Sequence, residues 1–172
     1  MVTWTPLEEE LRSLAGAVPD PELPVLTLEE LGVLRGVEVL APGRVRVRLT
    51  PTYTGCPAIG AMSADIERVL YDHGMTEVSV VTVLAPAWST DDISAEGRRK
   101  LAEFGIAPPR PHDAAGPSAG PSAGPVPLAL SVRCPHCGST DTELLSRFSS
   151  TACKALRRCV SCREPFDHFK EL

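Results

Sequence analysis

The feature that most constrains the fold of this chain is a pair of Cys-x-x-Cys motifs near its C-terminus. The motifs are Cys134/Cys137 and Cys159/Cys162, with residues 138–158 between them. Two cysteines on one tight turn, met by a second pair that a hairpin brings back, can close a tetrahedron of thiolates around a divalent ion. The sequence therefore predicts a small all-β zinc ribbon, with these four cysteines as ligands of a structural Zn²⁺.

Two other interpretations of the four thiolates remain open, an iron–sulfur cluster and two disulfides. Disulfides fit poorly with the expected location. Residues 1–6 carry no charged-then-apolar leader, no apolar run is long enough to cross a bilayer, and the last residues show no lipidation signal. We therefore expect a cytosolic, reducing environment, in which cysteines serve as ligands or reactive thiols. Of the six cysteines, Cys56 and Cys153 remain without a metal role.

Composition divides the chain into two domains. Residues 107–127 carry a Gly-Pro-Ser-Ala repeat and no large apolar side chain except Val126, too little apolar surface to offset their ordering entropy. We predict a first domain over residues 1–106, a linker over 107–127, and the ribbon over 128–172.

Charge argues against a nucleic-acid partner. The first domain has 9 Lys/Arg against 16 Asp/Glu, and the ribbon has 7 against 5. A nucleic-acid surface needs a basic patch with aromatic side chains for stacking, and neither half supplies one. We expect neither nucleic acid nor a membrane among the partners.

Periodicity indicates an α+β fold for the first domain. The predicted order α-β-β-α-β-α favours a small mixed sheet with helices packed on one side. Residues 78–84 are nearly all apolar, so we expect a buried strand there. The expected elements are a helix through Leu7, Leu11 and Leu14 ending by Gly16, a hairpin of residues 33–40 and 44–49, a helix after Cys56 with Ile59, Met62, Ile66, Val69 and His73 on one face, the strand 78–84, and a helix over 94–104 capped by Ser94 or Asp92.

Cys56 is the candidate reactive thiol. It lies in the loop of residues 50–58, and Pro57 suits the first position of the following helix. Its sulfur would then face unpaired N–H groups and the positive end of the helix dipole, which lowers a thiol pKa. We expect Cys56 to be the most nucleophilic thiol outside the ribbon ligands, with Cys153 partly sheltered. A buried, inert cysteine at a helix start is an equally open interpretation.

Asp20 and Glu22 form an acidic motif, Asp-Pro-Glu-Leu-Pro, on a segment stiffened by two prolines. Two carboxylates on an extended stretch suit a metal, a cap or a basic group of a partner. The simpler interpretation is an acidic turn in which Asp20 caps a backbone amide. We interpret His73 and His136 as packing and turn residues.

The acidic motif, Leu31-Gly32-Val33-Leu34 and the run from Thr50 to Pro57 together resemble the iron–sulfur-cluster assembly family that includes SufT and the eukaryotic cytosolic targeting factors. Three further parts of the sequence are the two Cys-x-x-Cys motifs, called knuckles below, the run from Phe148 to Leu156 and the segment Glu164–Lys170. Together they resemble PaaD, also called PaaJ, a family of accessory proteins of bacterial phenylacetyl-CoA epoxidases. Thr54 stands where that pattern commonly has serine, and His136 stands where arginine is common.

The resemblance implies an accessory role in phenylacetate catabolism, in which the protein matures or assembles a multicomponent monooxygenase. It implies that Cys56 binds a cluster, sulfur or iron, that Asp20 and Glu22 support it, and that Cys153 is a thiol kept by this subgroup. The implied partners are epoxidase subunits, especially the ferredoxin-like reductase, with a homodimer as a further expectation. A non-catalytic scaffold is the alternative. We predict that the protein is not itself an enzyme, because the sequence has neither a dinucleotide-binding glycine pattern nor a histidine/carboxylate cluster at ligand spacing.

Overall fold

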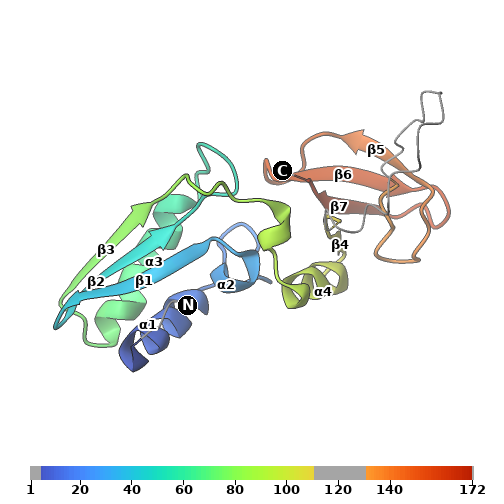
Figure 1. Cartoon of the computed structure of the whole chain (residues 1–172). Coiled ribbons are helices and arrows are strands. Elements are labelled where there is room, and N and C mark those ends of the chain that lie inside the picture. Colours follow the sequence, from blue (N-terminus) through green and yellow to red (C-terminus); the bar gives the residue numbers. More distant parts are fainter. Residues whose placement is uncertain (1–4, 111–130, 172) are drawn as a thin grey trace, which may run out of the picture. The chain divides into compact units, whose positions relative to one another are not determined.

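The computed structural model describes residues 5–110 and 131–171 (Figure 1). The chain forms two compact units, one up to Lys100 and one from Leu101 to Glu171. Most of the predicted linker lies outside the described residues. Among the described helices, none is both long and apolar enough to cross a membrane.

The first unit is built on a three-stranded sheet in the order β1-β2-β3. Strand β1 (Leu34–Ala41) pairs antiparallel with β2 (Arg44–Leu49), and β2 pairs parallel with β3 (Glu77–Thr82). In β2 the apolar side chains are buried while the intervening arginines are exposed. This alternation means that only one face of the sheet is covered, and the predicted mixed sheet is confirmed.

Two helices cover the buried face of this sheet. Helix α1 (Pro6–Gly16) packs against β1, helix α3 (Ile59–Asp72) packs against β3, and the two helices contact each other (Figure 1). A capping box between Thr5 and Glu8 begins α1. The helix residues that are buried include Leu11 and Ala15 of α1 and Met62, Ile66 and Leu70 of α3.

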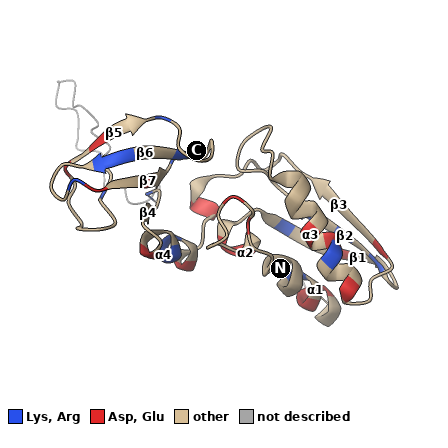
Figure 2. Ribbon diagram, turned by 180° about the vertical axis from the view of Figure 1, so that it is seen from behind, with Lys and Arg blue, Asp and Glu red and all other residues tan. Residues whose placement is uncertain are grey.

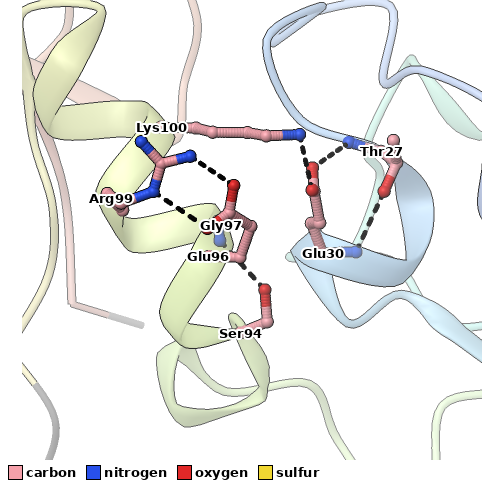
Figure 3. Close-up of polar contacts among 7 residues, drawn as sticks. All are labelled: Thr27, Glu30, Ser94, Glu96, Gly97, Arg99 and Lys100. Atoms are coloured by element: carbon pink, nitrogen blue, oxygen red, sulfur yellow. Dashed lines mark hydrogen bonds and ion pairs between the residues drawn. The ribbon is translucent and has the colours of Figure 1, made fainter.

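A short helix, α2 (Leu28–Leu31), follows the segment that carries the acidic motif. Glu30 and Thr27 form its capping box, and the Nζ of Lys100 lies 2.6 Å from Glu30 Oε1 (Figure 3). Lys100 belongs to α4 (Ala95–Glu103), which follows the 3₁₀ turn η1 (Thr90–Asp92). Gly97 N–H donates to Ser94 Oγ at 2.9 Å at the start of α4, whereas Asp92 closes the capping box of η1.

The prediction that residues 78–84 form a buried strand is wrong. Strand β3 ends at Thr82, and Val78 is its one buried side chain, while Leu84 is 62% exposed. The reason is topological, because β3 lies at an edge of the sheet and the helices cover one face only.

His73 also differs from its prediction as a packing residue. It is the C-cap of α3, with Nε2 at 3.2 Å from Glu10 Oε1.

The second unit is a four-stranded sheet in the order β4-β7-β6-β5. Strands β5 (Thr142–Ser146), β6 (Lys154–Cys159) and β7 (Pro165–Phe169) are antiparallel neighbours, as expected for a ribbon. Strand β4 (Ile106–Ala107) adds to β7 in parallel, and both of its residues are buried. Ile106, the predicted end of the first domain, therefore lies in the sheet of the second unit. Composition does not reveal the pairing of these two apolar residues with β7.

Candidate functional site

The four knuckle cysteines come together in the second unit. Their sulfur atoms all lie within 4.8 Å of one another. The Cys134 and Cys162 sulfurs are 3.8 Å apart and those of Cys137 and Cys159 are 3.5 Å apart, so each close pair joins one knuckle to the other. None of the six cysteines is in a disulfide.

Both knuckles adopt the same tight turn. In the first, Gly138 N–H donates to the Cys134 carbonyl at 2.9 Å, and Gly138 has φ of +76°. The equivalent residue of the second knuckle is Arg163, which adopts φ of +65°. A side chain in this region costs about 1–2 kcal/mol, so the second turn forms without the glycine that favours it. The Oγ atoms of Ser139 and Ser161, 2.8 Å apart, link the two turns.

The donor set fits a single tetrahedral ion. Four thiolates about 2.3 Å from zinc span tetrahedral edges of about 3.8 Å, which agrees with the two close sulfur pairs. The N–H of Cys162 donates to the Cys159 sulfur at 3.5 Å, and this is the largest of several hydrogen bonds that together lower the pKa of Cys159 to about 6. The four cysteines are therefore arranged so that they could hold one metal ion.

Cys153 and His136 lie outside this group of sulfurs. Cys153 is buried, and its sulfur lies 3.1 Å from Thr151 Oγ1. His136 is exposed on the first knuckle. Neither side chain belongs to the group of possible metal ligands found among the described residues.

Cys56 lies in a hydrogen-bonded turn that precedes α3. Its N–H donates to the Tyr53 carbonyl at 3.3 Å, and Gly55 within the turn has φ of +86°. A glycine at the third position of a β-turn accommodates this positive φ without strain. Helix α3 begins at Ile59, two residues later than predicted from Pro57.

The expected low pKa of Cys56 is wrong. The Cys56 side chain is partly buried, and this burial raises the thiol pKa, although a hydrogen bond from the Ala58 N–H opposes the shift. The negative charges of Glu22 and Asp20 raise it further, while a hydrogen bond with the Tyr53 side chain lowers it. The sequence alone does not reveal the effect of the two carboxylates, because they reach the thiol only through the fold. The structure thus brings the acidic motif to Cys56, although the two are distant in the sequence.

Asp20 stabilises the backbone conformation of the acidic motif. It is 4% exposed, and its Oδ1 accepts hydrogen bonds from the N–H groups of Glu22 at 2.8 Å and Leu23 at 2.7 Å. The Asp20 N–H donates to the Leu26 carbonyl at 2.9 Å. Burial nevertheless raises the pKa of the Asp20 carboxyl. Asp20 therefore caps backbone N–H groups, as the simpler interpretation of the acidic motif predicts. Its negative charge also raises the pKa of Cys56.

We expect Asp20→Ala to lower the free energy of unfolding of the first unit by about 1–3 kcal/mol, since two N–H groups lose their acceptor and the one on Leu23 is buried. Asp20→Asn is the matched control, because its amide oxygen can still accept both bonds. The raised pKa means that ionised Asp20 destabilises the fold. The stability of the wild type relative to Asp20→Asn should therefore increase as pH falls through the folded-state pKa towards the unfolded value of about 3.9. Chemical denaturation across this pH range measures both effects, and an Asp20→Ala variant as stable as the wild type would contradict the capping role.

We expect Cys56 to react slowly with iodoacetamide at neutral pH, because its raised pKa leaves little thiolate. The rate should keep rising beyond the ordinary thiol pKa of 9.0. Tyr53→Phe removes a hydrogen bond that favours the thiolate and should move the profile to still higher pH. Tyr71→Phe is the control, since the Tyr71 hydroxyl accepts from the Val78 N–H at 3.4 Å. Rate-resolved mass spectrometry of the Cys56 peptide measures the profile, and a midpoint below the ordinary value would refute this electrostatic description.

Comparisons with known proteins match each unit separately. Residues 8–84 match the family described as "Iron-sulfur cluster assembly protein", and residues 118–170 match the "PaaD zinc beta ribbon domain". A crystal structure of a domain of unknown function, DUF59, from Bacillus anthracis is similar at 29% identity and a TM-score of 0.51, covering 55% of this chain and 90% of that one.

Two curated relatives cover different shares of the chain. A Porphyromonas gingivalis protein named "Fe-S protein maturation auxiliary factor" is 33% identical over 95 residues, which are 55% of this chain and 90% of that protein. An Escherichia coli K12 protein, named as one subunit of a "Putative 1,2-phenylacetyl-CoA epoxidase", is 46% identical over 165 residues, which are 96% of this chain and 93% of the relative. With both units matched in the same order, the chain belongs to the family of this epoxidase protein, in which an iron–sulfur cluster assembly domain precedes a PaaD zinc ribbon.

Proposed function

We propose that this protein is an accessory factor of phenylacetate catabolism that matures or assembles the multicomponent phenylacetyl-CoA 1,2-epoxidase. In this proposal it delivers an iron–sulfur cluster, or a component of one, to the ferredoxin-like reductase subunit. The observation that carries the proposal is the meeting of Cys56 with Asp20 and Glu22 in the unit that matches the iron–sulfur assembly family. The names of the two curated relatives support the pathway and the maturation role respectively.

A single cysteine ligand at Cys56 suits transfer better than storage. Among residues 5–110 and 131–171, the ribbon cysteines are the one group of three or more potential ligands that lies close enough to hold an ion. A cluster or iron at Cys56 would therefore take its remaining ligands from a client or from a second chain. Incomplete ligation makes release easier, and nearby carboxylates disfavour a free thiolate while attracting a cation.

The ribbon, in this proposal, holds a structural Zn²⁺ on Cys134, Cys137, Cys159 and Cys162. Zinc bound by four thiolates is redox-inert and has no open position for a substrate. All four sulfurs lie within 4.8 Å of one another, which suits a single ion, whereas a cluster divides its thiolates between different irons and so spreads them farther apart. Iron on the same sulfurs is the alternative.

A non-catalytic scaffold subunit of the oxygenase complex is the second candidate function. It would need the ribbon and its surfaces but not Cys56. In either function we propose a cytoplasmic protein that is not itself catalytic and acts on protein partners, with neither nucleic acid nor a membrane among them. Figure 2 shows acidic residues along α1 and around α2, and these would repel a polyanion such as nucleic acid.

Anaerobic metal and sulfide analysis separates these two functions. Wild-type protein purified without oxygen should carry iron in addition to zinc, and Cys56→Ala should lose the iron while keeping the zinc. Reconstitution with ferrous iron and sulfide should restore the iron to the wild type only. Equal iron in both proteins, or none in either after reconstitution, would contradict a role of Cys56 in cluster maturation.

A further inference from the structure

Strand β3 presents an open, uncharged edge. It lies at the end of the β1-β2-β3 order, and the run from Val78 to Leu84 contains no charged residue, glycine or proline. Val80, Val81 and Val83 are half-buried, and Leu84 is 62% exposed. An uncharged, apolar edge of this kind is a template for another strand, and proteins ordinarily protect such edges.

The opposite edge of the same sheet is protected. Strand β1 has irregular register between Leu34 and Gly36 and between Val39 and Ala41, which disrupts any continuous ladder. The Val39 N–H already donates to Glu8 Oε1 at 3.1 Å. Because the fold protects β1 but leaves β3 straight and regularly paired with β2, the open β3 edge is not a general property of this sheet.

Hydrogen bonding identifies the donors on the open edge. The Val83 N–H donates to the Leu49 carbonyl on β2 at 2.7 Å, so alternate residues of β3 point their N–H groups to β2. The N–H groups of Val78, Val80 and Thr82 therefore point away from β2. The Tyr71 hydroxyl accepts from Val78 at 3.4 Å, which leaves the donors of Val80 and Thr82 for a further strand.

Charge selects the partner. Glu77, the one charged residue of β3, lies 2.8 Å from the guanidinium of Arg44, so the edge is electrically neutral. A charged partner strand would lose hydration without gaining a counter-ion. A second copy of β3 offers an uncharged run of the same length, from Val78 to Leu84, with the same open donors.

We propose that β3 pairs with β3 of a second copy of this chain, antiparallel about a two-fold axis through Val81. In this register Val80 lies opposite Thr82 of the second copy, so the outward N–H and C=O groups of both residues bond across the axis. Val81 lies opposite Val81, and Ser79 opposite Val83. The sheet becomes six-stranded, and the particle carries two Cys56 thiols. This inference concerns assembly alone and does not depend on the proposed function.

Sedimentation equilibrium of the full chain tests this pairing. The wild type should have twice the 18.4 kDa chain mass at high concentration. Val81→Lys and Val81→Glu should each give single chains, because like charges meet at the axis, and an equimolar mixture of the two variants should recover the doubled mass. Leu40→Lys, on exposed Leu40 of β1, is the control and should leave the wild-type mass unchanged.

A disulfide cross-link tests the register itself. Residues opposite each other at a non-hydrogen-bonded antiparallel pair have Cα atoms about 4.5 Å apart, within disulfide range. On mild oxidation, Val81→Cys should therefore form a symmetric cross-link between the introduced thiols of two chains, whereas Ser79→Cys should not link to itself. A wild type that sediments as a single chain at all concentrations, or variants of Val81 that associate as the wild type does, would overturn the proposal.

Discussion

Cys159→Ser is expected to release the ribbon's metal and to unfold the second unit, while the first unit keeps its own thermal transition. The buried cluster beneath the metal site is small, and Cys134 and Cys159 are themselves part of it; its other members are Ala107, Val132 and Phe166. A cluster of this size contributes little towards offsetting the conformational entropy of the unit. Zinc coordination supplies about 10–16 kcal/mol in isolated zinc-binding units, so the loss of one ligand removes the main source of stability.

Metal analysis and calorimetry of the variant measure this result. Cys153→Ser is the matched control, because Cys153 is also buried in the second unit but lies outside the group of four sulfurs. It should retain one zinc per chain and both transitions. A second unit that stays folded after complete zinc removal, or iron in place of zinc on the four thiolates, would contradict the assignment.

Cys56→Ala is expected to abolish growth on phenylacetate to the same extent as deletion of the whole protein. The thiol is half-buried in a turn whose backbone hydrogen bond does not involve the side chain, so its removal should change stability by less than about 1 kcal/mol. The loss of growth would therefore come from the missing thiol and not from unfolding of the protein. Thr54→Ala, an exposed change in the same loop, is the control and should support normal growth. Growth of the Cys56→Ala strain at the wild-type rate would favour the scaffold function.

Local spacing in the sequence was sufficient to predict the ribbon's fold. Two cysteines three residues apart share one turn wherever that turn lies, and a hairpin is the shortest connection that returns the second pair. The α+β fold of the first unit was also predictable, because alternation in Arg44–Leu49 and helical periodicity around Met62 and Ile66 are local patterns.

Properties set by tertiary neighbours could not be predicted. The pKa of Cys56 depends on burial and on Asp20 and Glu22, which only the fold brings near. The exposure of β3 depends on its place at the sheet edge, which its apolar sequence conceals. The left-handed backbone of Arg163 shows that a knuckle can form without glycine when the second unit constrains it.

The proposal that this protein matures an iron–sulfur centre of the epoxidase is tested most directly on the client. The reductase subunit should be purified anaerobically from otherwise identical cells that contain the wild-type protein, Cys56→Ala, or no copy, and its iron and acid-labile sulfide measured per polypeptide. We expect a full complement of iron and sulfide with the wild type and a deficient reductase, made in normal amount, in the other two strains. Equal iron and sulfide in all three would contradict the maturation role.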